Sequence, residues 1–109
     1  MRQMTMIGLT AFLTLALPAF AQSPVESAMQ ENKVAMERMM KAMDEVKDMD
    51  PDIAFAKKMK AHHQGAIDMA DVETRYGVDS AAKDQARAIK AENIKSIREL
   101  DAFISKHSH

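Results

Sequence analysis

The sequence predicts an all-α protein, an up-down-up antiparallel helical bundle that follows a cleaved N-terminal signal segment. Apolar residues recur at helical spacing in three segments, and each segment begins with a residue that caps helices. Proline or glycine stands at the breaks, and the links are short, so neighbouring helices are expected to run antiparallel. The result is either a monomeric three-helix bundle or a homodimer that completes a larger one.

Residues 1–21 are typical of a secretory signal peptide. Arg2 supplies the positive charge, an apolar run covers residues 4–17, and Ala19-Phe20-Ala21 forms an A-x-A cleavage site. The run is short for an uncleaved membrane span. We therefore expect an exported, periplasmic protein in which residues 22–109 form one domain.

The first two helices are expected over about residues 24–46 and 51–76. Ser23 precedes the first helix as its N-cap, and Glu26 stands where a capping box needs an acid. Asp50 precedes the second helix in the same capping role.

The third helix is expected over about residues 80–106, capped by Asp79 or Ser80. Gly77 stands before it as the C′ glycine that ends the second helix. The apolar stripe of the third helix contains Asn93, an amide that needs a hydrogen-bond partner if it is buried.

The composition restricts the classes of function and the sources of stability that fit this sequence. Cleavage leaves 14 basic and 16 acidic residues, a balance that disfavours nucleic acid as a partner. The chain has no cysteine, so disulfides cannot stabilise this small exported domain. A metal ion, an oligomer or very regular helix packing must then contribute stability. Methionine is abundant, with eight of eleven residues retained after cleavage.

Methionines gather on one face of the first expected helix. At about 100° per residue, Met36, Met39, Met40 and Met43 fall on the same side, and Met29 joins them. A methionine stripe is usually core packing, because Met fills irregular gaps. Four methionines in eight residues, on a face almost without leucine, isoleucine or valine, favour a second role as ligands.

The second expected helix carries two adjacent histidines beside two methionines. Met59 stands three residues before His62 and four before His63. The two imidazoles therefore lie on either side of Met59, one turn along the helix surface. Met69 lies on the side of His62. Gly65, in the middle of the helix, would permit another helix to approach closely.

These residue types point to copper. Thioether sulfur is neutral and soft, so it favours Cu(I) or Ag(I) over hard cations, and imidazole adds affinity for Cu(I), Cu(II) or Zn(II). A thioether also cannot be lost to disulfide formation in an oxidising compartment. The predicted cargo is copper, with Cu(I) favoured over Cu(II). The candidate ligands are Met36, Met39, Met40, Met43, Met59, His62, His63 and Met69.

The segment HHQGAIDMA at 62–70, preceded by DPDIAF at 50–55 and by Met59, closely resembles the CopM-like family, catalogued as domain-of-unknown-function family 305. The resemblance covers about residues 35–105. It implies a ferritin-like helical bundle, export, and periplasmic copper binding linked to copper tolerance. It also implies ligand roles for Met36, Met39, Met43, Met59, His62, His63 and Met69.

The chain departs from the family pattern at a few positions. Lys60-Ala61 stands where the family usually has Ile-Pro, and Met40 stands where a His often follows the methionine. Both departures bear on ligand geometry and metal preference. Asn93 and Ser96 replace a usual Gln and Glu, a change that bears on packing.

The leading expectation is a copper chaperone or buffer rather than an enzyme. Its Met/His site would lie between the first two helices, and its partner would be an envelope protein that delivers or accepts copper. A ferritin-like di-iron oxidase needs Glu-x-x-His pairs, and the sequence contains none. A Met-rich helical module that binds apolar partners without metal remains an open alternative.

Overall fold

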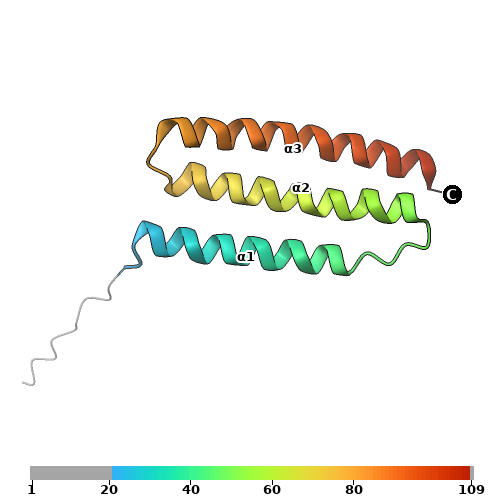
Figure 1. Ribbon diagram of the computed structural model, residues 1–109, viewed down its shortest axis with the longest axis horizontal. Helices are drawn as coiled ribbons and strands as arrows, with labels where there is room; N and C mark the ends of the chain where they lie inside the picture. The colour runs from blue at the N-terminus through green and yellow to red at the C-terminus, as the bar shows by residue number, and fades with distance from the viewer. Residues whose placement is uncertain (1–20, 109) are drawn as a thin grey trace, which may run out of the picture.

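The computed structural model describes residues 21–108, which Figure 1 shows as three helices. They are α1 (Pro24–Asp44), α2 (Pro51–Tyr76) and α3 (Ser80–His107). No strand occurs within residues 21–108, so the predicted all-α, up-down-up architecture is confirmed. The predicted signal segment, apart from Ala21, lies outside the described residues.

Side chains cap the start of each helix. The Ser23 hydroxyl accepts a 3.1 Å hydrogen bond from the Glu26 N–H, and the Glu26 carboxylate accepts one of 3.1 Å from the Ser23 N–H. The Asp50 carboxylate accepts bonds from two backbone N–H groups of the first turn of α2. Asp79, not Ser80, caps α3, because its carboxylate accepts a 2.7 Å bond from the Ala82 N–H.

Helix α1 ends at Asp44, two residues before the expected end. The Val46 N–H bonds to the Met43 carbonyl at 3.3 Å, three residues back, so the last turn tightens instead of continuing as α-helix. Asp44 and Glu45 also place negative charge at a helix C-terminus, where the macrodipole disfavours it.

Gly77 ends α2, but it does not act as the left-handed C′ glycine that its position predicted. It is the C-cap residue with φ −64° and ψ 152°, so it does not adopt the left-handed conformation. A Cβ at this position would lie 2.5 Å from the backbone oxygen of Glu73. Glycine is needed here because the chain passes too close to the last turn for any side chain.

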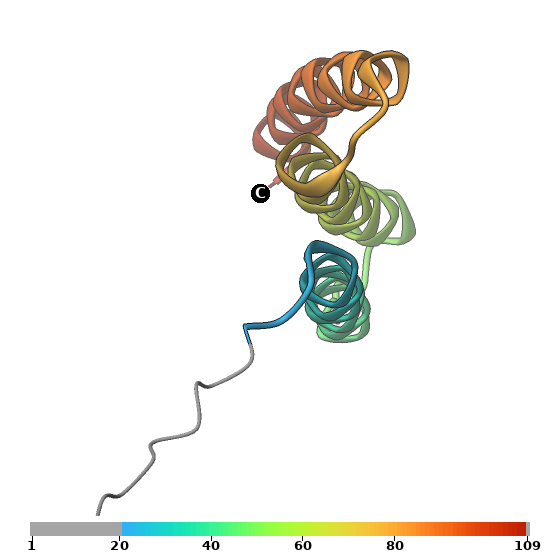
Figure 2. The ribbon, with the colours of Figure 1, turned by 90° about the vertical axis from the view of Figure 1, so that its left-hand side faces the viewer.

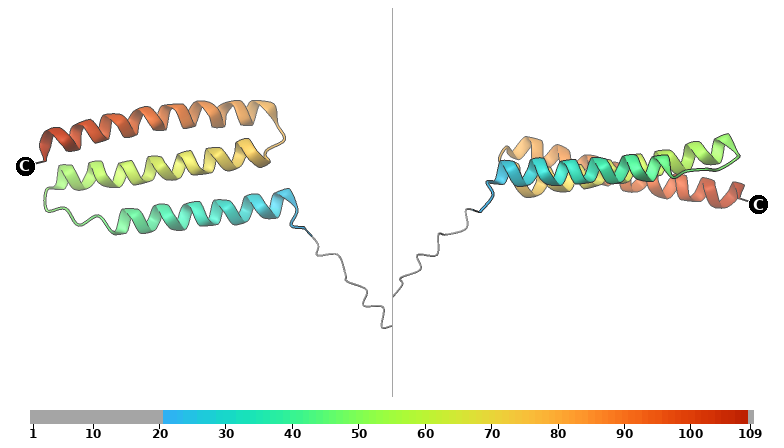
Figure 3. Two further views of the ribbon diagram at one scale, coloured as in Figure 1. Left: turned by 180° about the vertical axis from the view of Figure 1, so that it is seen from behind. Right: turned by 90° about the horizontal axis from the view of Figure 1, so that it is seen from below.

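The three helices form one layer with α2 in the middle. Figure 2 shows them end-on as a single twisted row, and the edge-on view in Figure 3 shows no second layer. Within the described residues, α2 contacts both α1 and α3, while α1 and α3 do not contact each other. The helices therefore do not close around a shared core.

The buried core is small. It consists of three larger residues, Ile53, Ile67 and Val72, and four alanines, Ala35, Ala56, Ala70 and Ala86. No large side chain among the described residues is completely buried. Most apolar side chains therefore lie along seams between helices and keep one side open. Among the described helices, none combines the length and apolarity needed to cross a membrane.

Candidate metal centre

Close contacts fix the register between α1 and α2. Met39 packs directly on Gly65, where an added Cβ would lie 2.9 Å from the Met39 Cβ. Nearer the start of α1, the Tyr76 hydroxyl donates a 2.6 Å hydrogen bond to Glu31. The helices are antiparallel and each rises about 1.5 Å per residue, so these two contacts set the height of every other residue pair along the seam.

This register brings predicted ligands from the two helices to matching heights. Met43 stands level with His62, and Met36 stands level with Met69. The two levels are two helical turns apart, about 10 Å. Met39 lies between them on the seam. The α1–α2 seam thus holds four thioethers and one imidazole within a strip about two turns long.

The methionines of α1 differ in exposure. Met36 is 48% exposed and Met40 is 58% exposed, whereas Met39 and Met43 are half-buried at the seam. The residue that α1 does bury against α2 is Ala35. Thioethers on α1 are therefore open on one side to an incoming ion.

Helical geometry gathers the exposed apolar side chains on one side of the row, which we call the methionine face. On α1 it begins at Val25 and includes Met29 and Met36, which share one side of the helix. On α2 it lies on the side of Ala66. We define the methionine face by Val25, Met29, Met36, Met40, Phe55, His62, Met69 and Ile89.

The two histidines diverge. Their ring centroids are 6.0 Å apart, and their planes cross at 80°. His62 is exposed on the side of α1, while His63 is half-buried and turns to α3. Met59 lies on the same side of α2 as His63, and both line a hollow at the α2–α3 seam together with Phe103. Five of the eight predicted ligands therefore belong to the α1–α2 side and two to the α2–α3 seam. The eighth, Met69, stands level with Met36 but also lines a hollow with Ile89 of α3.

A hydrogen bond to α3 orients His63. Its Nδ1 lies 2.5 Å from Oδ1 of Asn93, and the Asn93 amide nitrogen donates a 2.8 Å bond to the Ile89 carbonyl. Since the amide presents its oxygen to the ring, Nδ1 carries the proton and donates. The lone pair on Nε2 is then free, which is the tautomer that a metal-binding histidine needs.

Asn93 is a functional candidate that the sequence identified only in part. Its place in an apolar stripe predicted that it would need a partner. The partner is His63, thirty residues earlier in the chain. No pattern in a single sequence connects two residues across that separation, because the contact depends on how α2 and α3 pack.

Harder metals have no comparable site in this structure. Within residues 21–108, no three side chains among His, Asp and Glu come together as a ligand set. A metal held by this part of the chain would need thioethers to complete its coordination. Zinc and iron prefer the nitrogen, oxygen or thiolate ligands that such a set lacks.

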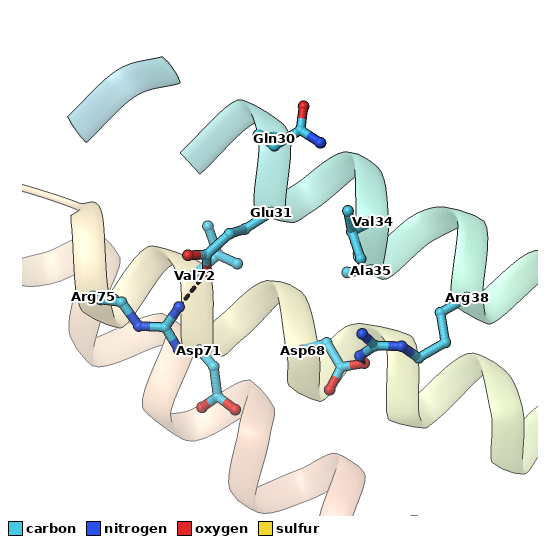
Figure 4. A pocket seen from close by; sticks show the side chains of 9 residues that line it. All are labelled: Gln30, Glu31, Val34, Ala35, Arg38, Asp68, Asp71, Val72 and Arg75. Atoms are coloured by element: carbon cyan, nitrogen blue, oxygen red, sulfur yellow. Dashed lines mark hydrogen bonds and ion pairs between the residues drawn. The ribbon is translucent and has the colours of Figure 1, made fainter. Parts of the chain in front are cut away.

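The opposite side of the row carries ion pairs that join helices, beside an apolar hollow lined by Met39, Ile97 and Ile104. Figure 4 shows Arg75 reaching to Glu31 and Arg38 lying beside Asp68 across the α1–α2 seam. The Arg38–Asp68 pair measures 3.6 Å. Hydrogen bonding to Tyr76 and the charge of Glu31 raise the pKa of Arg75. These polar pairs set the register without occupying the methionine face.

Hydrogen bonds to a carboxylate also hold the link between α1 and α2 against α2. The Lys57 ammonium donates a 2.8 Å hydrogen bond to Asp48, and the Asp50 N–H donates one of 3.0 Å. The bond from Lys57, followed by the bond from the Asp50 backbone, lowers the pKa of the Asp48 carboxyl. Asp48 therefore stays ionised and tethers the link to α2.

Comparison with known proteins identifies a family but no described relative. The sequence matches a domain of unknown function, DUF305, over residues 14–104. No curated protein matches the chain.

Proposed function

The chain belongs to the DUF305 family, and on that premise we propose that this member binds Cu(I) through thioethers and imidazole at its methionine face. It acts in the periplasm as a copper chaperone or buffer and contributes to copper tolerance. An envelope protein delivers or accepts the ion. Ag(I) shares the preference for sulfur, and the histidines extend binding to Cu(II).

The exposure of the methionines carries this proposal. A methionine that only fills a core is buried, yet Met36 and Met40 are 48% and 58% exposed, and the α1 residue buried against α2 is Ala35. Their register with His62 and Met69 supports a shared set of soft ligands. A surface that served solubility alone would carry charged or polar side chains at these positions.

The ligand set divides into two adjoining groups. The α1–α2 group consists of Met36, Met39, Met43, His62 and Met69, with Met40 beside it. The second group, Met59 and His63, adjoins the first because Met59 is one helical turn from His62. A row of adjoining soft ligands suits a carrier, since an ion can be held and passed on without a rigid cage.

A competition titration of the wild-type chain tests the proposal. With a competing chelator, Cu(I) should bind at least about 100-fold more tightly than Zn(II), because thioethers add affinity only for the soft ion. The matched control is Met49→Leu, since Met49 is 96% exposed in the link and belongs to neither group. Equal affinities for the two ions, or a preference for Zn(II), would contradict the proposal.

Asn93 provides a separate test of the second group. We expect Asn93→Leu to weaken Cu(I) binding by about 10-fold, the lower end of the loss seen when an outer partner of a ligating histidine is removed. The reason is that the His63 ring loses the acceptor that fixes its tautomer. Chelator competition measures the change, and circular dichroism checks that the helices remain.

Asn93→Asp is the matched control, since a carboxylate at this position still accepts a hydrogen bond from Nδ1 of His63. This variant should keep wild-type affinity. Unchanged affinity in Asn93→Leu, with its helices intact, would show that His63 does not act as a ligand.

A metal-independent function has one observation in its favour. Phe55 is 63% exposed and Ile89 is 45% exposed on the same face, and neither can bind a metal. An apolar partner could use this surface directly. Capture of a partner that survives removal of copper by a chelator would distinguish this function from copper carriage.

A further inference from the structure

The methionine face gathers most of the exposed large apolar side chains of the described residues. Ten large apolar side chains are exposed in this part of the chain, and seven of them lie on that face. The other three are Val34 on the opposite side and Met49 and Val78 in the links. Surfaces of this kind on a small protein mark an interaction site.

The single layer has too little core to explain a stable fold. Its buried residues are mostly alanine, and the chain has no cysteine to form a disulfide. The outer helices, α1 and α3, each pack along one seam only, against α2, since they do not meet each other. A second layer would cover the open sides of the helices and enlarge this core.

The dimensions of the face suit a dimer. Three helices of about 30–40 Å, spaced 8–10 Å apart, present about 1,000 Å² on one side of the row. A stable protein interface buries about 800 Å² on each partner. The area available on one copy is therefore sufficient, and the partner must offer an equally flat apolar surface.

Shape favours the same face on a second copy, since that copy offers an equally flat apolar surface. The cross-helix ion pairs Arg75–Glu31 and Arg38–Asp68 lie on the opposite side. Two acids adjoin the face, because Glu73 lines a hollow with Met69 and Glu99 lines one with Phe55. The stacked faces must therefore leave these carboxylates at the hydrated rim, since an unpaired buried charge would destabilise the interface.

We propose that two copies of this chain stack their methionine faces across a two-fold axis to form a six-helix, two-layer dimer. The interface is isologous, so each copy contributes the same side chains and the assembly closes at two. The dimer forms without copper, and it dissociates to expose the methionines that the proposed function assigns to Cu(I). It supplies the second layer that α1, α2 and α3 lack individually.

Thiol labelling of metal-free protein tests the dimer, because the chain has no native cysteine. Met36→Cys and Val34→Cys form a matched pair on α1, with native side chains 48% and 40% exposed on opposite sides of the row. At about 100 µM protein, the thiol at position 36 should react at least 10-fold more slowly than the thiol at position 34. Equal protection of both positions would overturn the proposed face.

Sedimentation of the metal-free wild-type chain provides the second measurement. We expect a dimer at about 100 µM that dissociates on dilution, and a melting temperature that rises with concentration. Met40→Lys should yield a monomer or an unfolded chain, whereas Val34→Lys should remain a dimer. A folded wild-type monomer at this concentration, or a dimer that Met40→Lys leaves intact, would refute the proposal.

The test of the dimer and the test of copper binding can give different results. Replacing methionine by leucine removes the sulfur but keeps the apolar surface. A leucine variant that dimerises without binding copper would support the dimer alone. A wild-type monomer that binds Cu(I) would support the copper proposal alone.

Discussion

Replacing four methionines by leucine should lower Cu(I) affinity on the order of 1,000-fold while the helices stay folded. The variant combines Met36→Leu, Met40→Leu, Met43→Leu and Met69→Leu. Removing even an outer partner of a ligand costs 10–100-fold in metal affinity, so the loss of several ligands costs more. Leucine matches methionine in volume and in helix propensity, so each exchange costs less than about 1.5 kcal/mol.

The control for this variant removes methionines outside the ligand groups. Met29→Leu with Met49→Leu changes two residues that are 69% and 96% exposed. The control should bind Cu(I) as tightly as the wild type in the same competition titration. If the four-leucine variant also kept full affinity, the thioethers would not be the ligands, whatever the histidines do.

Gly65→Leu should destabilise the fold by about 2 kcal/mol, because overpacking outweighs the better helix propensity of leucine. A Cβ at this position would already lie 2.8 Å from the Met39 Cγ and 2.9 Å from its Cβ. The Met39 Cβ cannot swing away as a side-chain end can, so α1 itself must move. Thermal unfolding should show a loss of about 10 °C in a chain of this size.

The partner residue supplies the control for Gly65→Leu. Met39→Ala removes the atoms that the new side chain meets, so the double variant should recover part of the lost stability. The copper affinity of Gly65→Leu should also fall, since displacing α1 separates Met43 from His62. Unchanged stability of the single variant would mean that α1 does not pack on Gly65.

Local signals predicted the helices well because capping is a short-range property. The first residues of α1, α2 and α3 follow from Ser23, Asp50 and Asp79, whose side chains bond to the next turn. The end of α1 and the conformation of Gly77 did not follow, since both depend on bonds that form only when the last turn closes.

Packing between helices was harder to predict. The periodicity of α2 placed Met59, His62 and His63 on one broad side, and it could not show that His63 turns to α3. That direction depends on Asn93, which comes thirty residues later. The open row was also not predictable, because helical spacing shows that a helix has an apolar stripe without showing which neighbour covers it.

The most direct test of the copper proposal is X-ray absorption at the copper edge of the Cu(I)-loaded wild-type chain. Sulfur and nitrogen scatter differently, so the spectrum identifies the ligand atoms around the ion. We predict at least two sulfur scatterers, which must be thioethers because the chain has no cysteine. A first shell of nitrogen and oxygen alone would contradict the account, because copper would then be bound without the methionines.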